Sequence, residues 1–232
     1  NVGIIDIAWG FGYVALAWTY YVLTEGDPSR KVLITVLVTV WGMRLTLHLA
    51  RRNIGKAEDY RYQDFRQRYG AESYWWKSFF QAFMLQGLLI VIIIAPVLLS
   101  SYSSEQTGLT IFDYVGLVVW LIGFGFEAIG DWQLARFKAN PENQGQVLRT
   151  GLWQYTRHPN YFGDAVVWWA YFIIALSTPF GFLSIFAPVI MTVLLLRVSG
   201  VSMLEESLRE TKPAYAEYIR CTSAFIPKPP KC

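Results

Sequence analysis

The chain has 232 residues, of which 54% are hydrophobic and 17% aromatic, and its formal net charge is only +3. This composition excludes an ordinary soluble domain and indicates one polytopic membrane domain. The two cysteines, Cys221 and Cys232, both lie in the C-terminal tail, without a disulfide framework or a metal-ligand spacing. We therefore expect two free thiols and no metal site.

A first membrane span is predicted over residues 3–23, which are long enough to cross a hydrocarbon core of about 30 Å at about 1.5 Å per residue. Its one charge, Asp6, is either a helix-end residue at the interface or a functional acid that faces a cavity. The second span covers residues 32–50. It carries Arg44 and His48, which are four residues apart and therefore share one helical face. Snorkelling competes with burial for Arg44, and the shared face favours a polar lining.

Residues 51–79 form a long polar loop, rich in charge and aromatic residues, that is expected to lie along the membrane surface. It leads into a third span at about residues 80–99, and the fourth span covers residues 112–130. Glu127 and Asp131 point the same way, and two carboxylates on one helical face repel unless a cationic or hydrogen-bonding group separates them. A ligand or an arginine is therefore expected beside them.

Two further spans are predicted at residues 161–176 and 180–196. The very short turn between them makes them antiparallel neighbours. Residues 203–218 mix charged with apolar side chains in a pattern typical of an amphipathic surface helix. The sequence thus predicts an all-α, polytopic helical bundle of about six spans, or seven with a further N-terminal helix, plus this surface helix. We expect a single domain over residues 1–232, with the cofactor-binding half at about 112–232.

The basic residues are distributed unevenly among the segments between spans. Lys and Arg number two in residues 24–31, seven in 51–79, none in 100–111, four in 131–160, none in 177–179 and six from 197 onward. By the positive-inside rule, the long 51–79 loop, the 131–160 connector and the C-terminal tail are cytoplasmic. We expect a multi-pass protein of a bacterial inner membrane or its equivalent, with a site that is entered from the cytoplasm.

The densest group of hydrogen-bonding side chains is the segment Arg157–Asp164, with the sequence RHPNYFGD. Pro159 suits the first turn of a helix, where its missing N–H is no loss. The free N–H groups of that turn, the positive end of the helix dipole, Arg157 and His158 together suit a phosphate-bearing ligand. The alternative is an ordinary positively charged flank with a proline at the helix start.

Neither a glycine-rich phosphate fingerprint nor a His/Cys cluster with zinc spacing is present in the sequence, which argues against a soluble type of nucleotide fold. The polar groups near the cytoplasmic ends could still hold a large, anionic, ribose-containing cofactor. Carboxylates accept hydrogen bonds from ribose hydroxyls, and Arg or Lys neutralises phosphates. This set comprises Arg44, Arg52, Glu127, Asp131, Lys138, Arg157, Asn160, Asp164, Arg197 and Glu205.

A recognisable set of residues runs from Gly151-Leu152-Trp153 through Arg157–Asp164 to Pro227. It resembles the C-terminal domain of the steroid 5-alpha-reductase superfamily, and most closely its branch of bacterial proteins of unknown function called DUF1295. Sterol C14 and C7 reductases and isoprenylcysteine carboxyl methyltransferases resemble the same stretch more distantly. The resemblance covers most of the chain, and its 151–164 motif is specific for the superfamily but not for the reaction. The matching residues are Gly151-Leu152-Trp153, Tyr155, Arg157 to Asp164, Arg197, Glu205-Glu206, Tyr215, Tyr218 and Pro227.

This resemblance implies that NADPH is the cofactor and suggests where it binds. The implied cofactor-binding residues are Arg52, Glu127, Asp131, Lys138, Tyr155, Arg157, His158, Asn160, Tyr161, Asp164, Arg197, Glu205 and Tyr218. The implied catalytic group contains Asp6, which resembles a catalytic glutamate in position, together with Arg44 and His48. The tyrosine that the family has three residues before that arginine is Trp41 here, and an indole cannot deliver the proton that a phenol can. Tyr13 and His48 are the nearest substitutes.

The resulting hypothesis is a membrane-embedded, NADPH-dependent reductase of an activated carbon–carbon double bond in a lipid such as a steroid, sterol or isoprenoid. Asp6, or an acid that it orients, would stabilise the developing enolate. The alternative is a lipid or prenyl-cysteine methyltransferase that uses S-adenosylmethionine, and a third possibility is a lipid-binding or scaffold protein without catalysis. The expected partners are a lipid substrate and the bilayer, with no nucleic acid; the oligomeric state stays open.

Overall fold

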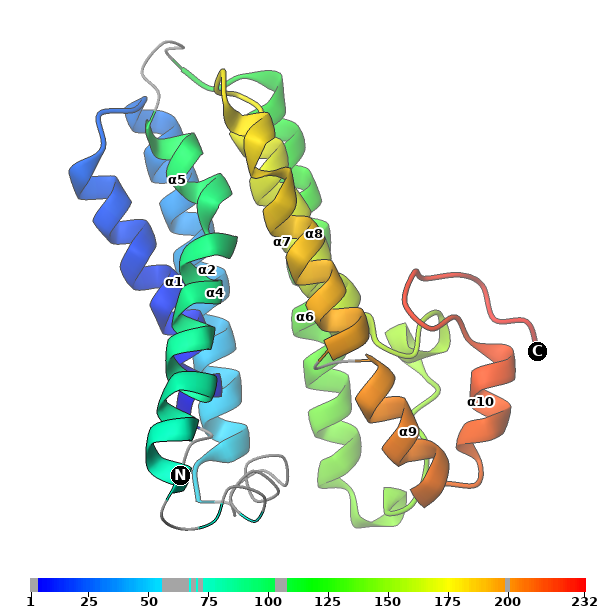
Figure 1. The fold of residues 1–232 in the computed structure, drawn as a ribbon. Helices are drawn as coiled ribbons and strands as arrows, with labels where there is room; N and C mark the ends of the chain where they lie inside the picture. The colour runs from blue at the N-terminus through cyan, green and yellow to red at the C-terminus, as the bar shows by residue number, and fades with distance from the viewer. Residues whose placement is uncertain (1–3, 56–66, 68–69, 71–72, 103–107, 199–200) are drawn as a thin grey trace. The chain divides into compact units, whose positions relative to one another are not determined.

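The structure is a computed structural model, and it describes residues 4–55, 67, 70, 73–102, 108–198 and 201–232. All regular elements in the described residues are helices, which confirms the predicted all-α bundle (Figure 1). The chain divides into two compact units. The first contains residues 1–110 and 175–184, and the second contains residues 111–174 and 185–232.

The first unit opens with α1 (Ile4–Leu23) and α2 (Pro28–Asn53), which pack against each other at two glycines. A Cβ atom on Gly10 would lie 2.3 Å from the carbonyl oxygen of Gly42, and one on Gly42 would lie 2.7 Å from that of Gly10. Small residues at such a crossing let two membrane helices approach closely. Beside it, the buried rings of Tyr13 and Trp41 lie 5.7 Å apart.

The start of α2 is fixed by a proline and a capping carboxylate. Pro28 occupies the first turn, and Asp27 Oδ1 accepts a hydrogen bond from the Arg30 backbone N–H at 3.1 Å. Asp27 Oδ2 also accepts from the Gly108 N–H at 2.6 Å, and the Arg30 guanidinium donates to the Gly108 carbonyl at 2.9 Å. The hydrogen bond from Gly108, followed by that from Arg30, lowers the pKa of Asp27 despite the opposing effect of burial.

The third long stretch of the first unit is helical from residue 73 to 102 and so includes the span predicted at residues 80–99. It comprises the π-helical segment η1 (Phe79–Met84), then α4 (Leu85–Ile93) and α5 (Ala95–Tyr102). The predicted surface loop at 51–79 falls largely outside the described residues.

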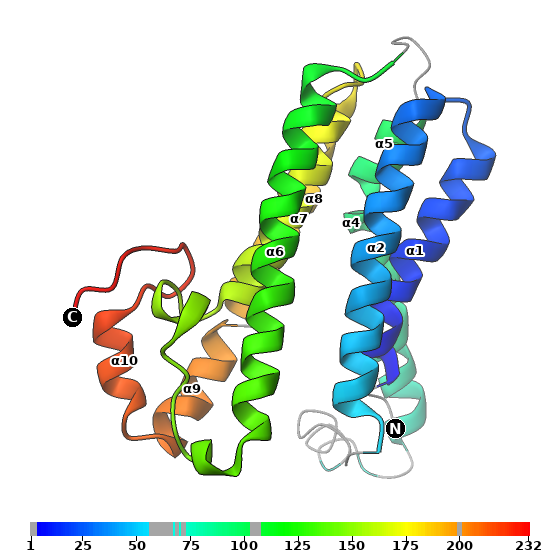
Figure 2. The ribbon, with the colours of Figure 1, turned by 180° about the vertical axis from the view of Figure 1, so that it is seen from behind.

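The second unit is built on α6 (Ile111–Ala139) and α7 (Pro159–Ala175), which meet along a glycine seam (Figure 2). Gly116, Gly123 and Gly130 recur every seven residues of α6, so they lie on one face. Added Cβ atoms there would lie 2.4 Å from Ile174, 2.8 Å from the Gly163 carbonyl oxygen and 3.1 Å from the Asn160 nitrogen, respectively. The seam therefore brings the two backbones into contact at the start of α7.

The helix pair predicted around the 177–179 turn is confirmed. After α7, the 3₁₀ segment η4 (Gly181–Ile185) leads into α8 (Phe186–Val193) and the π-helical η5 (Leu194–Val198). The Trp169 indole N–H donates to the Thr192 hydroxyl at 3.3 Å, which ties α7 to α8.

The C-terminal tail contains two helices, α9 (Val201–Thr211) and α10 (Tyr215–Cys221), in place of the one helix expected over residues 203–218. The break lies at Pro213, because proline has no N–H to continue a helix. Beyond α10 the chain returns to the start of α7. The Arg157 N–H donates to the Ser223 carbonyl at 2.9 Å, and the Lys228 N–H donates to the Tyr155 carbonyl at 3.0 Å.

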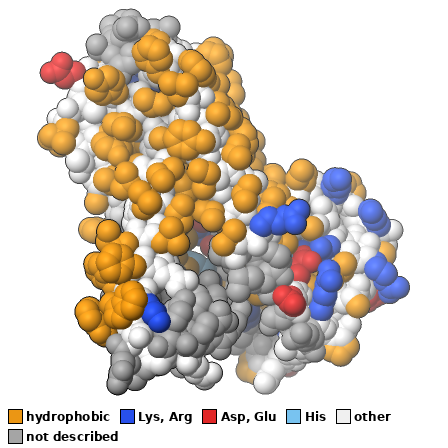
Figure 3. All heavy atoms as spheres, viewed as in Figure 1, with side chains coloured by type: hydrophobic (Ala, Val, Ile, Leu, Met, Phe, Trp, Pro, Cys, Tyr) orange, Lys and Arg blue, Asp and Glu red, His pale blue; other side chains and the backbone are white. Residues whose placement is uncertain are grey.

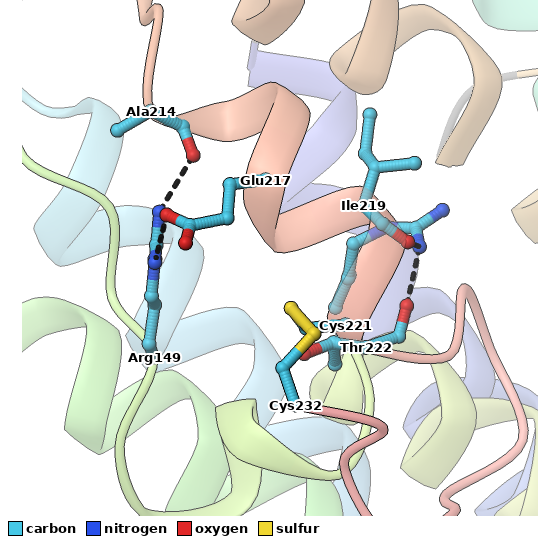
Figure 4. The surroundings of a disulfide bond; sticks show 8 residues. Arg149, Ala214, Glu217, Ile219, Cys221, Thr222 and Cys232 are labelled. Carbon is cyan, nitrogen blue, oxygen red and sulfur yellow. Dashed lines mark hydrogen bonds and ion pairs between the residues drawn. A yellow bond between two sulfur atoms is a disulfide. The ribbon is translucent and has the colours of Figure 1, made fainter.

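The expectation of free thiols is wrong. Cys221, at the end of α10, forms a disulfide with Cys232, and their Cα atoms lie 5.2 Å apart (Figure 4). The non-helical segment between the two cysteines returns to the end of α10, where the Lys231 N–H donates to the Cys221 carbonyl at 2.9 Å. The spacing of the two cysteines alone did not reveal this return.

Among the described residues, four helical stretches are long and apolar enough to cross a membrane: 28–53, 73–102, 111–139 and 181–198. Helices α1 and α7 occupy the other two positions predicted as spans. Hydrophobic side chains cover the visible surface of the long helices, and Lys and Arg gather over the C-terminal elements (Figure 3). These features identify a helical membrane protein.

Candidate functional site

A cavity of about 330 Å³ lies within the second unit, beside the RHPNYFGD segment. Its walls come from the last turns of α6, the connector at residues 140–148, the two residues that precede α7, and α9 and α10. The connector includes the short 3₁₀ segment η2 (Pro141–Asn143). Apolar side chains such as Phe137, Leu148 and Leu208 form much of the lining, together with a few polar groups. This mixture is typical of a small-molecule site.

The 3₁₀ segment η3 (Gly151–Gln154) is anchored on α6 and sets one wall of the cavity. Gly151 has a positive φ of 64°, and a Cβ atom there would lie 2.3 Å from the Gln133 side chain. Gln133 accepts a hydrogen bond from the Leu152 N–H at 3.0 Å, and the Trp153 indole donates to the Gly130 carbonyl at 3.2 Å. These contacts hold the buried Trp153 ring against the cavity.

A buried ionic cluster contributes to the cavity wall through Arg157 and His158. Arg157 Nε donates to Glu205 Oε1 at 2.8 Å, and His158 Nε2 lies 3.2 Å from the same oxygen. Arg157 Nη1 also donates to the carbonyls of Ile219 (3.2 Å) and Thr222 (2.5 Å), which join α7 to α10. Burial raises the pKa of Glu205, but the hydrogen bonds from His158 and Arg157 outweigh it and hold the pKa at about 2. A buried charge is tolerated because it is paired and hydrogen-bonded.

His158 retains one ring nitrogen for a further partner. Its ring is 1% exposed and stacks on Tyr161, with ring centroids 5.6 Å apart and an interplanar angle of 2°. Nδ1 is buried and forms no hydrogen bond to any described residue. An unsatisfied buried polar atom costs about 1–3 kcal/mol. Since His158 lines the cavity, a polar group of a bound ligand could satisfy this nitrogen.

Two buried tyrosines of α10 complete the inner wall. The Tyr218 hydroxyl donates to the Trp153 carbonyl, and the Tyr215 and Tyr218 rings lie 5.8 Å apart. Burial raises the pKa of Tyr215 to about 12, with Glu205 adding to the effect, and burial also raises that of Tyr218. Both phenols therefore remain neutral at physiological pH.

The predicted carboxylate group lies on the facing sides of α6 and α7. Glu127 and Asp131 are buried, with 3% and 8% exposure, and Asp164 is half-buried. Next to Asp131 lies the amide of Asn160, whose Nδ2 donates to Asp131 Oδ1 at 3.0 Å. The arginine or ligand expected beside the two carboxylates stays a prediction. None of these four residues lines the cavity described above. The structure thus separates them from the cavity-lining residues Lys138, Arg157, His158 and Tyr218.

The remaining predicted residues are more scattered. Tyr155 is exposed at the end of η3, and Arg197 is exposed in η5. Arg44 and His48 are half-buried on α2, and exposed Arg52 donates to Asn53 at 3.2 Å. These three belong to the first unit.

Asp6 lies in α1, but its side chain is outside the part of the chain that the structure describes. Trp41, where the resembling family has its tyrosine, is buried with 1% exposure, and Tyr13 is the phenol in contact with its ring.

Sequence reasoning missed Lys212, which lies just after α9 and lines the cavity. Its Nζ donates to the Gln146 carbonyl at 2.5 Å. Arg149, also overlooked, directly follows the connector and binds α10 by donating to Glu217 at 2.9 Å and to the Ala214 carbonyl at 2.7 Å (Figure 4). The only sequence signal was the run of charge in the tail, which fits a solvated helix face equally well.

Comparison with known proteins places the chain in a family without an assigned function. A protein of Schizosaccharomyces pombe (strain 972), described as uncharacterized, is 25% identical over 197 residues, which cover 75% of this chain and 57% of the relative. The chain thus spans a little over half the length of that relative. No solved structure matches. Residues 1–222 match the family described as "Protein of unknown function (DUF1295)", and the chain therefore belongs to the DUF1295 family.

Proposed function

We propose that this protein is a membrane-embedded, NADPH-dependent reductase of an activated carbon–carbon double bond in a lipid, related to the steroid 5-alpha-reductase superfamily. The observation that carries the proposal is the cavity beside the RHPNYFGD segment, in which a buried histidine nitrogen lacks a partner among the described residues. Apolar and aromatic walls with cationic side chains suit a nucleotide, and long apolar helices suit a lipid substrate.

The residues of the second unit fit such a cofactor by their chemistry. His158 Nδ1 can accept a hydrogen bond in the neutral ring or donate one when the ring is protonated. Trp153 and Tyr218 offer aromatic surface for a base, and Lys138 offers positive charge. Glu127 and Asp131 are acceptors of the kind that ribose hydroxyls need. When bound, the nicotinamide would supply the hydride.

Arg157 and Glu205 have a different role in this proposal from the one expected. Arg157 Nε and Nη1 are occupied by Glu205 and two carbonyls. We therefore assign the pair to holding His158 in place, because Glu205 Oε1 contacts His158 Nε2 at 3.2 Å. Orientation of a site histidine by a carboxylate is a common arrangement.

In this proposal, the residues that act on the lipid and supply its proton belong to the first unit. We retain Asp6, Arg44 and His48 as the proposed catalytic group, and the buried Tyr13 beside Trp41 as the available phenol. The steroid, sterol or isoprenoid nature of the substrate rests on the resemblance alone. The proposed location is a bacterial inner membrane, with the cavity facing the cytoplasm, because Lys and Arg gather at that end of the second unit (Figure 3).

Thermal melting of the purified full chain with NADPH, NADH or S-adenosylmethionine tests the proposal. NADPH should raise the melting temperature, since a specific ligand at a hundred times its dissociation constant stabilises by about 2.7 kcal/mol. His158→Ala should weaken this protection, whereas the exposed control Arg220→Gln should not. Protection by S-adenosylmethionine alone would favour the methyltransferase. Protection by neither would leave a lipid-binding protein without catalysis.

A further inference from the structure

Lys212 is a cationic residue at the rim of the cavity whose partner is a neutral backbone carbonyl. It follows α9, lines the cavity and donates to the Gln146 carbonyl of the connector at 2.5 Å. The contact therefore joins two of the cavity walls, the connector and the segment that follows α9. A backbone carbonyl is a neutral partner, and an ammonium group has three donors. Lys212 can thus bind an anion at the rim without breaking an ion pair.

The charge of the lining supports an anionic ligand. Among the described residues that line the cavity, Lys138, Arg157 and Lys212 are cationic, and none is an aspartate or glutamate. Glu205 neutralises Arg157 at 2.8 Å. For Lys212, the described part of the chain provides the Gln146 carbonyl as partner and no carboxylate. An excess positive charge at the rim of an apolar cavity favours a ligand with a ring system and a phosphate.

The position of the cavity selects one end of the proposed cofactor. Its walls include the last turns of α6, where the apolar stretch 111–139 ends, and the connector, α9 and α10, which lie outside the four long apolar stretches. The nicotinamide must meet a lipid among membrane helices, so the opposite, adenosine end belongs in this cavity. Its volume of about 330 Å³ lies near the lower limit for small-molecule sites and suits a portion of a dinucleotide.

We propose that Lys212 is a specificity-determining residue that recognises the 2′-phosphate of the adenosine end and so selects NADPH over NADH. This inference rests on the proposed function. NADPH and NADH differ only in that phosphate, and a basic residue near the ribose is the usual means of accommodating it. On binding, the phosphate would replace the Gln146 carbonyl as the partner of Lys212.

The test compares the affinities of both dinucleotides for the detergent-solubilised full chain, measured by calorimetry, in wild type and Lys212→Gln. We expect NADPH binding to weaken by about tenfold or more, the usual effect of losing one charge-assisted hydrogen bond. NADH binding should stay unchanged. Lys212→Arg should keep most of the preference. Lys228→Gln is the matched control, because Lys228 is an exposed lysine of the same unit that does not line the cavity.

Two adenosine nucleotides that lack the nicotinamide half test whether Lys212 recognises the 2′-phosphate itself. Adenosine 2′,5′-bisphosphate should compete with NADPH more strongly than adenosine 5′-monophosphate in wild type, and this advantage should disappear in Lys212→Gln. A smaller salt dependence of NADPH binding in that variant should accompany the loss. Both readouts report binding, so neither requires a known lipid substrate.

The failures of the two proposals are distinguishable. If wild type binds neither dinucleotide, the proposed function fails. If wild type prefers NADPH and Lys212→Gln keeps that preference, Lys212 is not the selective residue, although the proposed function stands. Equal weakening by Lys212→Gln and Lys228→Gln would also overturn the inference, because it would indicate a general effect of net charge. A ligand-free melting curve like that of wild type verifies that each variant folds.

Discussion

Glu205→Gln should reveal how much the buried ionic cluster stabilises the second unit. The substitution keeps the side-chain volume and removes the negative charge that Arg157 and His158 face at 2.8 and 3.2 Å. A pKa of about 2 in the folded protein, against an ordinary value of 4.5, corresponds to about 3 kcal/mol of stabilisation at neutral pH. For a chain of this size, that is a fall in melting temperature of about 6–12 °C.

The pH dependence gives a second reading of the same interaction. Because the folded pKa is depressed, the unfolded chain takes up a proton near pH 4.5 while folded Glu205 resists it until about pH 2. The stabilisation is therefore complete above pH 4.5 and decreases as the pH falls toward 2. The difference in stability between wild type and Glu205→Gln should be roughly halved at pH 3.

Thermal melting between pH 3 and 8 measures both effects. The control is Glu217→Gln, which removes an exposed ion pair with Arg149 at 2.9 Å and should change melting little, because exposed pairs are screened by solvent. The reasoning is refuted if Glu205→Gln melts like wild type at neutral pH, or if its deficit stays constant down to pH 3.

Three further predictions concern packing, the disulfide and topology. Gly163→Ala should destabilise the α6–α7 pair by about 1–3 kcal/mol, since its Cβ atom would lie 2.4 Å from the Glu127 nitrogen; melting measures this, and an unchanged curve would contradict the close approach. Cys232→Ser should lower the free energy of unfolding by up to about 2.8 kcal/mol, because it opens the loop that the disulfide closes at a separation of 11 residues. Wild type melted under a reductant should show the same loss of stability as this variant. A cysteine at exposed Phe180 should react with a membrane-impermeant reagent from outside, and one at exposed Glu142 only after permeabilisation; reversed labelling would invert the proposed orientation.

The long helices could be predicted from sequence because apolar runs and proline positions dominate their formation. Pro159 begins α7 as expected, and the 177–179 turn brings α7 and α8 together. The tail was harder. Its charge pattern fits one amphipathic helix, whereas Pro213 divides it so that α10 can fold back over the cavity.

Much of the site depends on contacts between distant segments, which no local pattern encodes. From the sequence, Arg157 is expected to bind a phosphate, because arginine and phosphate are common partners. In the structure the C-terminal tail folds back, so that Glu205 and two backbone carbonyls accept hydrogen bonds from the Arg157 guanidinium. The Cys221–Cys232 pairing follows from the same return. The glycine seam, in contrast, could have been read from the sequence, because Gly116, Gly123 and Gly130 recur at a period of seven.

The glycine seam has a mechanical consequence. The two helix backbones are in close contact at Gly116, Gly123 and Gly130. If α6 slid or rotated along α7, side chains would clash with backbone carbonyl groups, so we expect the two helices to move as one rigid unit. Any opening of the cavity that admits a ligand must then come from movement of its other walls, which are the connector, α9 and α10. Spin labels on α6 and α7 should keep a fixed separation while a label on α9 shifts when a ligand enters.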